Sequence, residues 1–101
     1  MEQYNKLVRD KIPDILDNKG ISYEKRIATR EEYKVELIRK LEEEVKEFSE
    51  AGSPEELADV IEVIEALKRL SDYASVEELR KKKSDEKGAF NNMIILKGEK
   101  D

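Results

Sequence analysis

Residues 47–56 read EFSEAGSPEE, and this stretch decides the fold because it ends one helix and begins another. Gly52 is typical of a helix end, since glycine adopts the left-handed backbone conformation without steric cost. Ser53 and Glu56 form a capping box, and Pro54 occupies the first helical position, where its missing N–H is not needed. With so short a connection, the two helices are predicted to pack as an antiparallel hairpin.

The helices on both sides of this turn carry apolar residues at helical spacing. The earlier helix begins at Thr29, which forms a capping box with Glu32, and runs to about Ala51. Its apolar stripe comprises Val35, Ile38, Leu41, Val45 and Phe48. The later helix has a broader apolar arc, which spans roughly 220° at about 100° per residue. That arc contains Leu57, Val60, Ile61, Val63, Ile64, Ala66, Leu67 and Leu70.

Two shorter helices are predicted outside the hairpin. One begins near Asp10, has Pro13 in its first turn and stops at residues 18–20, NKG. The other starts at a third capping box, residues 75–78, and ends near Gly88. The hairpin is therefore flanked on each side by one helix.

Residues 21–27, which alternate only loosely, could form a short edge strand, and the apolar residues 93–96 favour a short strand that could pair with them. With 101 residues and no linker or repeat, the chain is expected to form a single domain, 1–101. We therefore predict a mainly all-α fold, a helical hairpin-based bundle with possible short terminal strands. Because one neighbouring helix cannot cover the wide apolar arc, we also expect a homo-oligomer, most simply a two-fold dimer.

Composition excludes several classes of function. The net charge of −5 argues against binding along a nucleic-acid polymer, since phosphate backbones need a net positive partner. The chain has no cysteine and no histidine, which excludes disulfides, thiolate nucleophiles and the most common general base. No apolar run is long enough for a membrane span or a signal peptide, so a cytoplasmic protein with no membrane partner is expected.

Two carboxylates of the later helix project onto its apolar side. Glu56 and Asp59 fall among the apolar residues of the arc, whereas Glu62 and Glu65 project to the opposite, solvated side. An unpaired charge on the buried side of a helix is costly. Glu56 and Asp59 are therefore expected to have a compensating partner.

The earlier helix repeats this pattern more weakly. Glu44 borders the apolar stripe, and Glu47 lies about 60° further out. Residues three apart share a helix face, so an antiparallel hairpin can bring Glu44 and Glu47 close to Glu56 and Asp59. Four clustered carboxylates repel one another unless a hard cation joins them, and oxygen ligands favour Mg²⁺, or Mn²⁺, over Zn²⁺ and copper.

A second interpretation of the same residues needs no metal. Glu56 is also the third residue of its helix, where a capping-box glutamate is expected whatever the function. A solvated helix face, paired with Lys40 and Lys46, could be formed by Glu42, Glu43, Glu44 and Glu47. Spacing alone leaves both interpretations open.

Three separated stretches resemble one protein family. Residues 40–47, KLEEEVKE, and 55–60, EELADV, resemble the paired E-x-x-E and E-x-x-D signature of MazG-like proteins, which belong to the all-α NTP pyrophosphohydrolases. The stretch 4–13, YNKLVRDKIP, is similar to the opening of a small subfamily labelled phosphoribosyl-ATP pyrophosphohydrolase-like. Residues 83–90, KSDEKGAF, are similar to the K-x-x-x-R-G-G-F element of that subfamily. The resemblance spans nearly the whole chain.

The resemblance implies a reaction, a metal site and an oligomer. The reaction is Mg²⁺-dependent hydrolysis between the α- and β-phosphates of a nucleotide, which gives a monophosphate and pyrophosphate. The implied metal ligands are Glu44, Glu47, Glu56 and Asp59. Because the chain has no histidine, a carboxylate must orient or deprotonate the attacking water, and Glu44 and Glu47 are the candidates. A homodimer that clears unwanted nucleotides is consistent with the same family.

Basic residues near the two ends of the chain are the expected phosphate partners. They are Lys6, Arg9, Lys11, Lys83 and Lys87, with ordinary surface charge as the alternative role. Two positions depart from the family pattern, since Lys87 stands where arginine is usual and Ala89 where a second glycine is usual. Lysine keeps the positive charge but loses the bidentate fork of arginine, which affects substrate preference rather than the metal site.

Two other classes of function stay open at this point. The departures at Lys87 and Ala89 leave room for a non-catalytic helical module that binds a nucleotide or a protein. An acidic metal-binding or scaffolding protein with no nucleotide partner would also account for the carboxylates. Assays of pyrophosphate release and of Mg²⁺-dependent nucleotide binding separate these possibilities from the enzyme.

Overall fold

A computed structural model describes residues 5–99 of the chain. Its elements are α1 (Ile12–Asn18), α2 (Arg30–Ala51), α3 (Pro54–Lys68), the short 3₁₀ helix η1 (Ser71–Tyr73) and α4 (Val76–Lys87). The all-α class is thus confirmed. Between residues 5 and 99 there is no strand, so the terminal strands expected at 21–27 and 93–96 are not seen. Tyr4, the first residue of the opening motif, lies outside the described residues.

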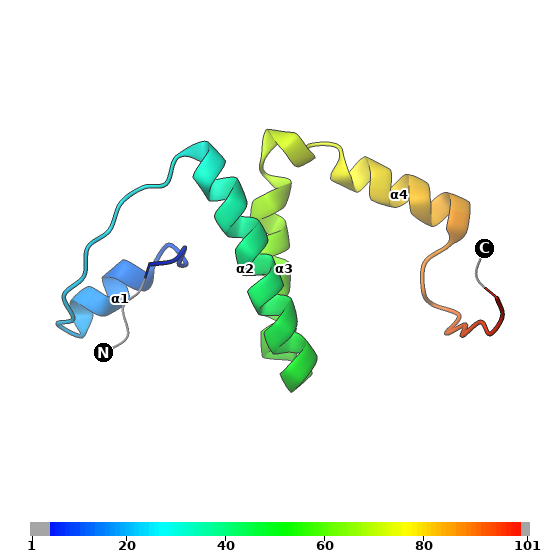
Figure 1. Cartoon of the computed structure of the whole chain (residues 1–101), viewed down its shortest axis with the longest axis horizontal. Coiled ribbons are helices and arrows are strands. Elements are labelled where there is room, and N and C mark those ends of the chain that lie inside the picture. Colours follow the sequence, from blue (N-terminus) through cyan, green and yellow to red (C-terminus); the bar gives the residue numbers. More distant parts are fainter. Residues whose placement is uncertain (1–4, 100–101) are drawn as a thin grey trace.

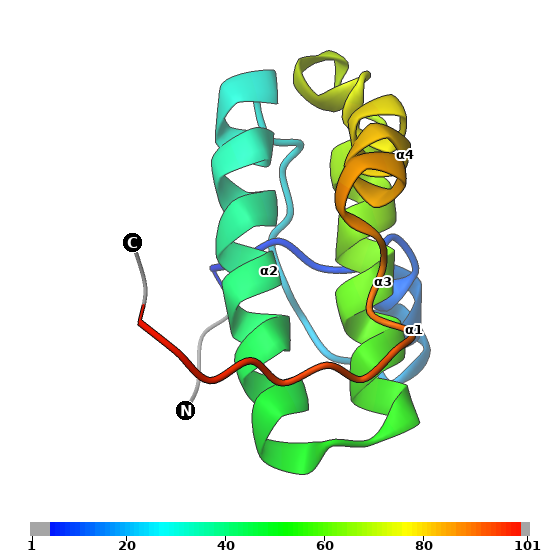
Figure 2. The same ribbon diagram turned by 90° about the vertical axis from the view of Figure 1, so that its right-hand side faces the viewer.

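The α2–α3 hairpin forms at the predicted turn (Figures 1 and 2). The Thr29 hydroxyl accepts a hydrogen bond from the Glu32 N–H at 3.2 Å, and the Ser53 hydroxyl accepts one from the Glu56 N–H at 3.3 Å. Between the helices, Gly52 has φ 63°, the left-handed conformation that stops α2. Local capping chemistry therefore fixes both helix ends at the turn.

The core lies between α2 and α3, near the end of the hairpin opposite the turn. Its buried residues are Leu37, Val63 and Leu70, and partly buried side chains that pack against them are Leu7, Tyr33, Leu41, Ala66, Leu67 and Tyr73. Leu70 contributes to this core from just beyond α3, because the helix ends at Lys68, earlier than the apolar spacing suggested. Leu7 ties the N-terminal segment to the hairpin.

The third predicted capping box does not form. Ser75 is the residue before α4, but its side chain makes no capping hydrogen bond. Its backbone has φ −92° and ψ 3°, whereas Thr29 and Ser53 are extended, as a capping residue must be. Ser75 follows η1 almost directly, so the preceding turn rather than its own side chain sets its conformation.

The chain is elongated, with extents of 56 × 32 × 24 Å and a radius of gyration of 18.1 Å. A compact chain of this length has a radius of gyration of about 13 Å. Figure 1 shows the reason, since α1 and α4 extend to opposite sides of the central hairpin. Leu57, Ile61 and Ile64 of the wide apolar arc are each at least 40% exposed. Among the described residues, no helix combines the length and apolar character needed to cross a lipid bilayer.

Candidate metal centre

Three of the four predicted ligands come together across the hairpin. Glu44 of α2 and Glu56 and Asp59 of α3 each place one carboxylate oxygen within 4.8 Å of the others. Glu56 and Asp59 share a face of α3 because they are three residues apart. We call these three residues the carboxylate cluster. The antiparallel packing that follows from the Gly52 turn is what brings the cluster together.

Glu47, the fourth predicted ligand, lies at the exposed rim of the cluster. Its carboxylate is close enough that its negative charge raises the pKa of the carboxyl groups of both Glu44 and Glu56. It is not among the residues whose oxygens lie within 4.8 Å of one another. Glu47 therefore adjoins the cluster without belonging to its centre.

Glu44 is the member that burial affects most. It is only 8% exposed, and its Oε2 atom, like Oε2 of Glu56, is buried without a hydrogen-bond partner. The Nζ atom of Lys40 lies 3.7 Å from the other oxygen of Glu44 and compensates part of the charge. A buried acceptor with no donor destabilises the fold, so these two oxygens leave a place that a cation would fill.

The pKa directions report the same imbalance. Burial raises the pKa of Glu44, and the charges of Glu47 and Asp59 raise it further, against the opposing effect of Lys40. Burial likewise raises the pKa of Glu56, followed by the charges of Glu47 and Asp59. The folded chain thus resists holding these carboxylates ionised together, which is the electrostatic state that a bound divalent cation relieves.

The donor set fits a hard divalent cation. All ligand atoms are carboxylate oxygens, which suit Mg²⁺, Mn²⁺ or Ca²⁺ better than Zn²⁺ or copper. Spacing in the sequence placed Glu44 only at the edge of the apolar stripe, and its full burial was missed. The signal was present, because Glu44 lies seven residues after Leu37 and three after Leu41, on the same helix face.

One of the five predicted phosphate-binding residues reaches the cluster. The Nη2 atom of Arg9 lies 2.7 Å from Oδ1 of Asp59. Lys6 lies nearby, with its Nζ atom 3.8 Å from Oε1 of Glu43, and Lys11 is exposed just before α1.

The basic residues near the C-terminus are not brought to the cluster. Lys83 and Lys87 belong to α4, which extends away from the hairpin in Figure 1. The start of α4 is tied to the end of α3, since Lys68 Nζ lies 3.2 Å from Oε1 of Glu77. Within one chain, the two predicted groups of phosphate partners are therefore on different sides of the hairpin.

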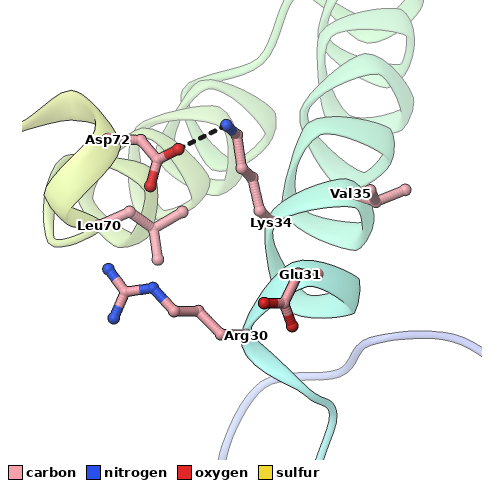
Figure 3. A pocket seen from close by; sticks show the side chains of 6 residues that line it. All are labelled: Arg30, Glu31, Lys34, Val35, Leu70 and Asp72. Atoms are coloured by element: carbon pink, nitrogen blue, oxygen red, sulfur yellow. Dashed lines mark hydrogen bonds and ion pairs between the residues drawn. The ribbon is translucent and has the colours of Figure 1, made fainter.

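A hollow of about 420 Å³ lies elsewhere, between the start of α2 and η1 (Figure 3). Its lining residues are Arg30, Glu31, Lys34, Val35, Leu70 and Asp72, and it includes no member of the cluster. Lys34 donates a hydrogen bond of 2.7 Å to Asp72 and sits 5.3 Å from the centre of the Tyr73 ring. These contacts fasten η1 to α2, so we assign this hollow a structural role.

Comparison with known proteins identifies no relative of this chain. No protein-family model, curated protein or solved structure matches the chain. The support for a function therefore comes from the geometry of the cluster and from the sequence motifs. The geometry by itself describes an acidic, partly buried group of carboxylates that could hold a divalent cation.

Proposed function

We propose that this protein is a Mg²⁺-dependent nucleotide pyrophosphohydrolase. It would cleave between the α- and β-phosphates of a nucleoside triphosphate and release a monophosphate and pyrophosphate. The observation that carries the proposal is the buried Glu44 carboxylate, which faces Glu56 and Asp59 with one oxygen unpartnered. The MazG-like motifs at 40–47 and 55–60 support it, because they contain the same three residues.

The residues divide into distinct chemical roles in this proposal. Glu44, Glu56 and Asp59 would hold the ion, for which Mn²⁺ is the alternative to Mg²⁺. When bound, such an ion neutralises phosphate charge and lowers the pKa of a coordinated water. Glu47, exposed at the rim, is placed to orient or deprotonate the attacking water, since Glu44 is buried and committed to the ion. Arg9 is placed to meet a phosphate oxygen beside the cluster.

The decisive experiment incubates a panel of nucleoside triphosphates with Mg²⁺ and measures pyrophosphate release. Glu44→Gln and Asp59→Asn should each lower the rate more than about 100-fold, because even residues that only support a metal ligand contribute about 10- to 100-fold. Glu62→Gln removes an exposed carboxylate from another face of α3 and should leave the rate unchanged. No release from any nucleotide by the unaltered protein would contradict the proposal.

A non-catalytic nucleotide-binding module is the second candidate. It is favoured by one observation, the position of Lys83 and Lys87 on α4, away from the cluster. Mg²⁺-dependent nucleotide binding without pyrophosphate release would identify it. Binding of Mg²⁺ without any nucleotide would point instead to an acidic scaffold.

Assembly as a homodimer belongs to the same proposal, as does a cytoplasmic location, where Mg²⁺ and nucleotides are abundant. The radius of gyration and the exposed Leu57, Ile61 and Ile64 leave an apolar surface that a second copy would cover.

Light scattering coupled to size-exclusion chromatography tests the dimer at micromolar concentration. Ile61→Glu should shift the protein to a monomer, because it buries a charge in the proposed interface. Ile21→Glu is the matched control, since both isoleucines are 49% exposed but Ile21 lies between α1 and α2, outside the hairpin. A stable monomer of the unaltered chain would contradict the dimer.

A further inference from the structure

Arg9 makes an ion pair that crosses from the N-terminal segment to the carboxylate cluster. Its Nη2 atom donates a hydrogen bond of 2.7 Å to Oδ1 of Asp59, 50 positions away in the sequence. Asp59 is one of the three residues whose oxygens converge, so Arg9 neutralises a group that would also bind the ion. The Arg9 guanidinium and a metal ion would therefore compete for the Asp59 carboxylate.

The fold holds Arg9 at this place from both sides. Two residues earlier, Leu7 packs against the core between α2 and α3. The Arg9 carbonyl oxygen accepts a hydrogen bond of 3.1 Å from the Ile12 N–H at the start of α1. The backbone is therefore fixed near the cluster, while the side chain, 57% exposed, has room to leave it. The Asp59 side chain is 41% exposed, so the pair lies at the surface, where water is available to replace either partner.

The charges of the cluster explain why a cation is held there. Glu44 is more than nine-tenths buried with an unpartnered oxygen, and Lys40 approaches it only to 3.7 Å. Glu56 also has a buried oxygen without a partner. Arg9 brings a positive charge closer to the group than Lys40 does, and arginine cannot lose its proton under these conditions. The N-terminal segment therefore holds a permanent positive charge, that of Arg9, beside the cluster.

We propose that Arg9 is an internal counter-ion that occupies the carboxylate cluster until a divalent cation displaces it. This rests on the proposed function, which supplies the ion. Once the ion binds Asp59, the Arg9 guanidinium is released beside the centre, where its planar fork matches a phosphate group of the nucleotide. Binding of the metal and readiness to bind the nucleotide are thereby linked through one side chain.

The linkage predicts opposite effects of one substitution on two ligands. In Arg9→Gln the metal has no internal competitor, so Mn²⁺ should bind about 2- to 5-fold more tightly, the range expected for an exposed ion pair. The Mn²⁺-loaded variant should bind a nucleotide more weakly, because the phosphate loses its arginine. The probe is a nucleoside triphosphate with a methylene bridge between the α- and β-phosphates, and both affinities are measured by calorimetry.

Arg39→Gln is the matched control. Arg39 pairs with Glu36 at the same distance of 2.7 Å on α2, without touching the cluster. Arg39→Gln removes the same positive charge as Arg9→Gln. A general electrostatic effect would therefore appear in both variants, and comparing the two isolates the effect of Arg9. Arg9→Lys keeps the charge without the fork and should restore the metal affinity of the unaltered protein but not its nucleotide affinity.

The outcomes distinguish this inference from the proposed function. Equal or weaker Mn²⁺ binding by Arg9→Gln, relative to Arg39→Gln, would overturn the counter-ion role while leaving the metal centre intact. No Mn²⁺ binding by the unaltered protein would instead overturn the metal centre itself. A merely structural role of Arg9 would weaken both ligands together, and far-ultraviolet circular dichroism of each variant identifies that case.

Discussion

Two glutamates, Glu44 and Glu77, show how differently this chain treats the same side chain at two places. Glu77, in the first turn of α4, accepts hydrogen bonds from Arg80 and pairs with Lys68 at 3.2 Å. Hydrogen bonds from Arg80 and Lys68 lower the pKa of Glu77 to about 2. Glu44, on α2 facing α3, has a raised pKa because it is buried. The Glu77 carboxylate is thus paired with two cations, whereas the Glu44 carboxylate keeps one oxygen without a partner.

The contrast shows that the shortage of positive charge around carboxylates is a local property of the cluster. At the α3–α4 corner two cations surround one exposed carboxylate, and the contact of Lys68 with Glu77 joins the two helices. At the cluster the chain gathers three carboxylates, and among residues 5–99 Lys40 and Arg9 are cations that pair with them. With 20 basic residues in the chain, more cations could have been placed there. The difference supports a role for the cluster that an external cation completes.

The largest expected effect is on stability, with opposite signs at the two sites. In the absence of metal, Glu44→Gln should increase the free energy of unfolding by about 1 kcal/mol, because it removes a buried charge with an unpartnered oxygen. Glu77→Gln should decrease it, since Arg80 and Lys68 each lose an ion pair, although Lys68 keeps its pair with Glu65. Urea unfolding monitored by circular dichroism measures both.

Saturating Mg²⁺ sharpens this result. The ion should stabilise the unaltered protein and the Glu77→Gln variant equally, and should hardly affect Glu44→Gln. Equal destabilisation by the two substitutions in metal-free buffer would remove the contrast between the two sites.

A smaller effect is expected in the pH dependence of the metal-free protein. Because the pKa of Glu44 and Glu56 is raised in the folded chain, stability should fall as the pH rises from their ordinary value of 4.5 through the folded value. Because the pKa of Glu77 is lowered to about 2, its contribution is complete above 4.5 and is lost as the pH falls toward about 2. The loss of stability toward neutral pH thus comes from the cluster, and Glu77 contributes to the loss toward acid together with Glu32 and Asp72, whose pKa is also lowered.

Unfolding curves between about pH 3 and pH 8 test this assignment. Glu44→Gln should reduce the fall in the free energy of unfolding toward neutral pH. Glu77→Gln should reduce its fall toward acid pH. If either substitution altered both limbs alike, the two sites would be electrostatically coupled and not independent.

The hairpin could be predicted from the sequence because its ends are set by neighbouring residues. Thr29 and Ser53 each cap the helix that follows, and Gly52 stops the one before. Ser75 has the same capping pattern but fails, since η1 fixes its backbone from outside the motif. The expected strands at 21–27 and 93–96 are absent from the described part of the chain for a related reason. A strand needs a partner, and residues such as Ile27 and Ile95, both 93% exposed, lack one in this structure.

Three of the four predicted ligands of the candidate site are brought together, but the cations that pair with them could not be predicted from the sequence. Helical spacing places Glu56 and Asp59 on the side facing α2, and the structure brings them to Glu44. The pairing of Arg9 with Asp59 depends on how the N-terminal segment folds back over the hairpin, which no local pattern encodes. The positions of Lys83 and Lys87 depend likewise on the direction of α4, which the turn through η1 determines.

The two-residue connection at Gly52 and Ser53 has a consequence for the order in which the protein is made. All three cluster carboxylates lie within residues 44–59, on both sides of this connection, so they assemble through contacts local in sequence, which form quickly. The centre would be complete on the ribosome once α3 has emerged, before α4 emerges in its turn. Arg9 is by then already present, so the nascent hairpin carries its own neutralising charge while it waits for an ion.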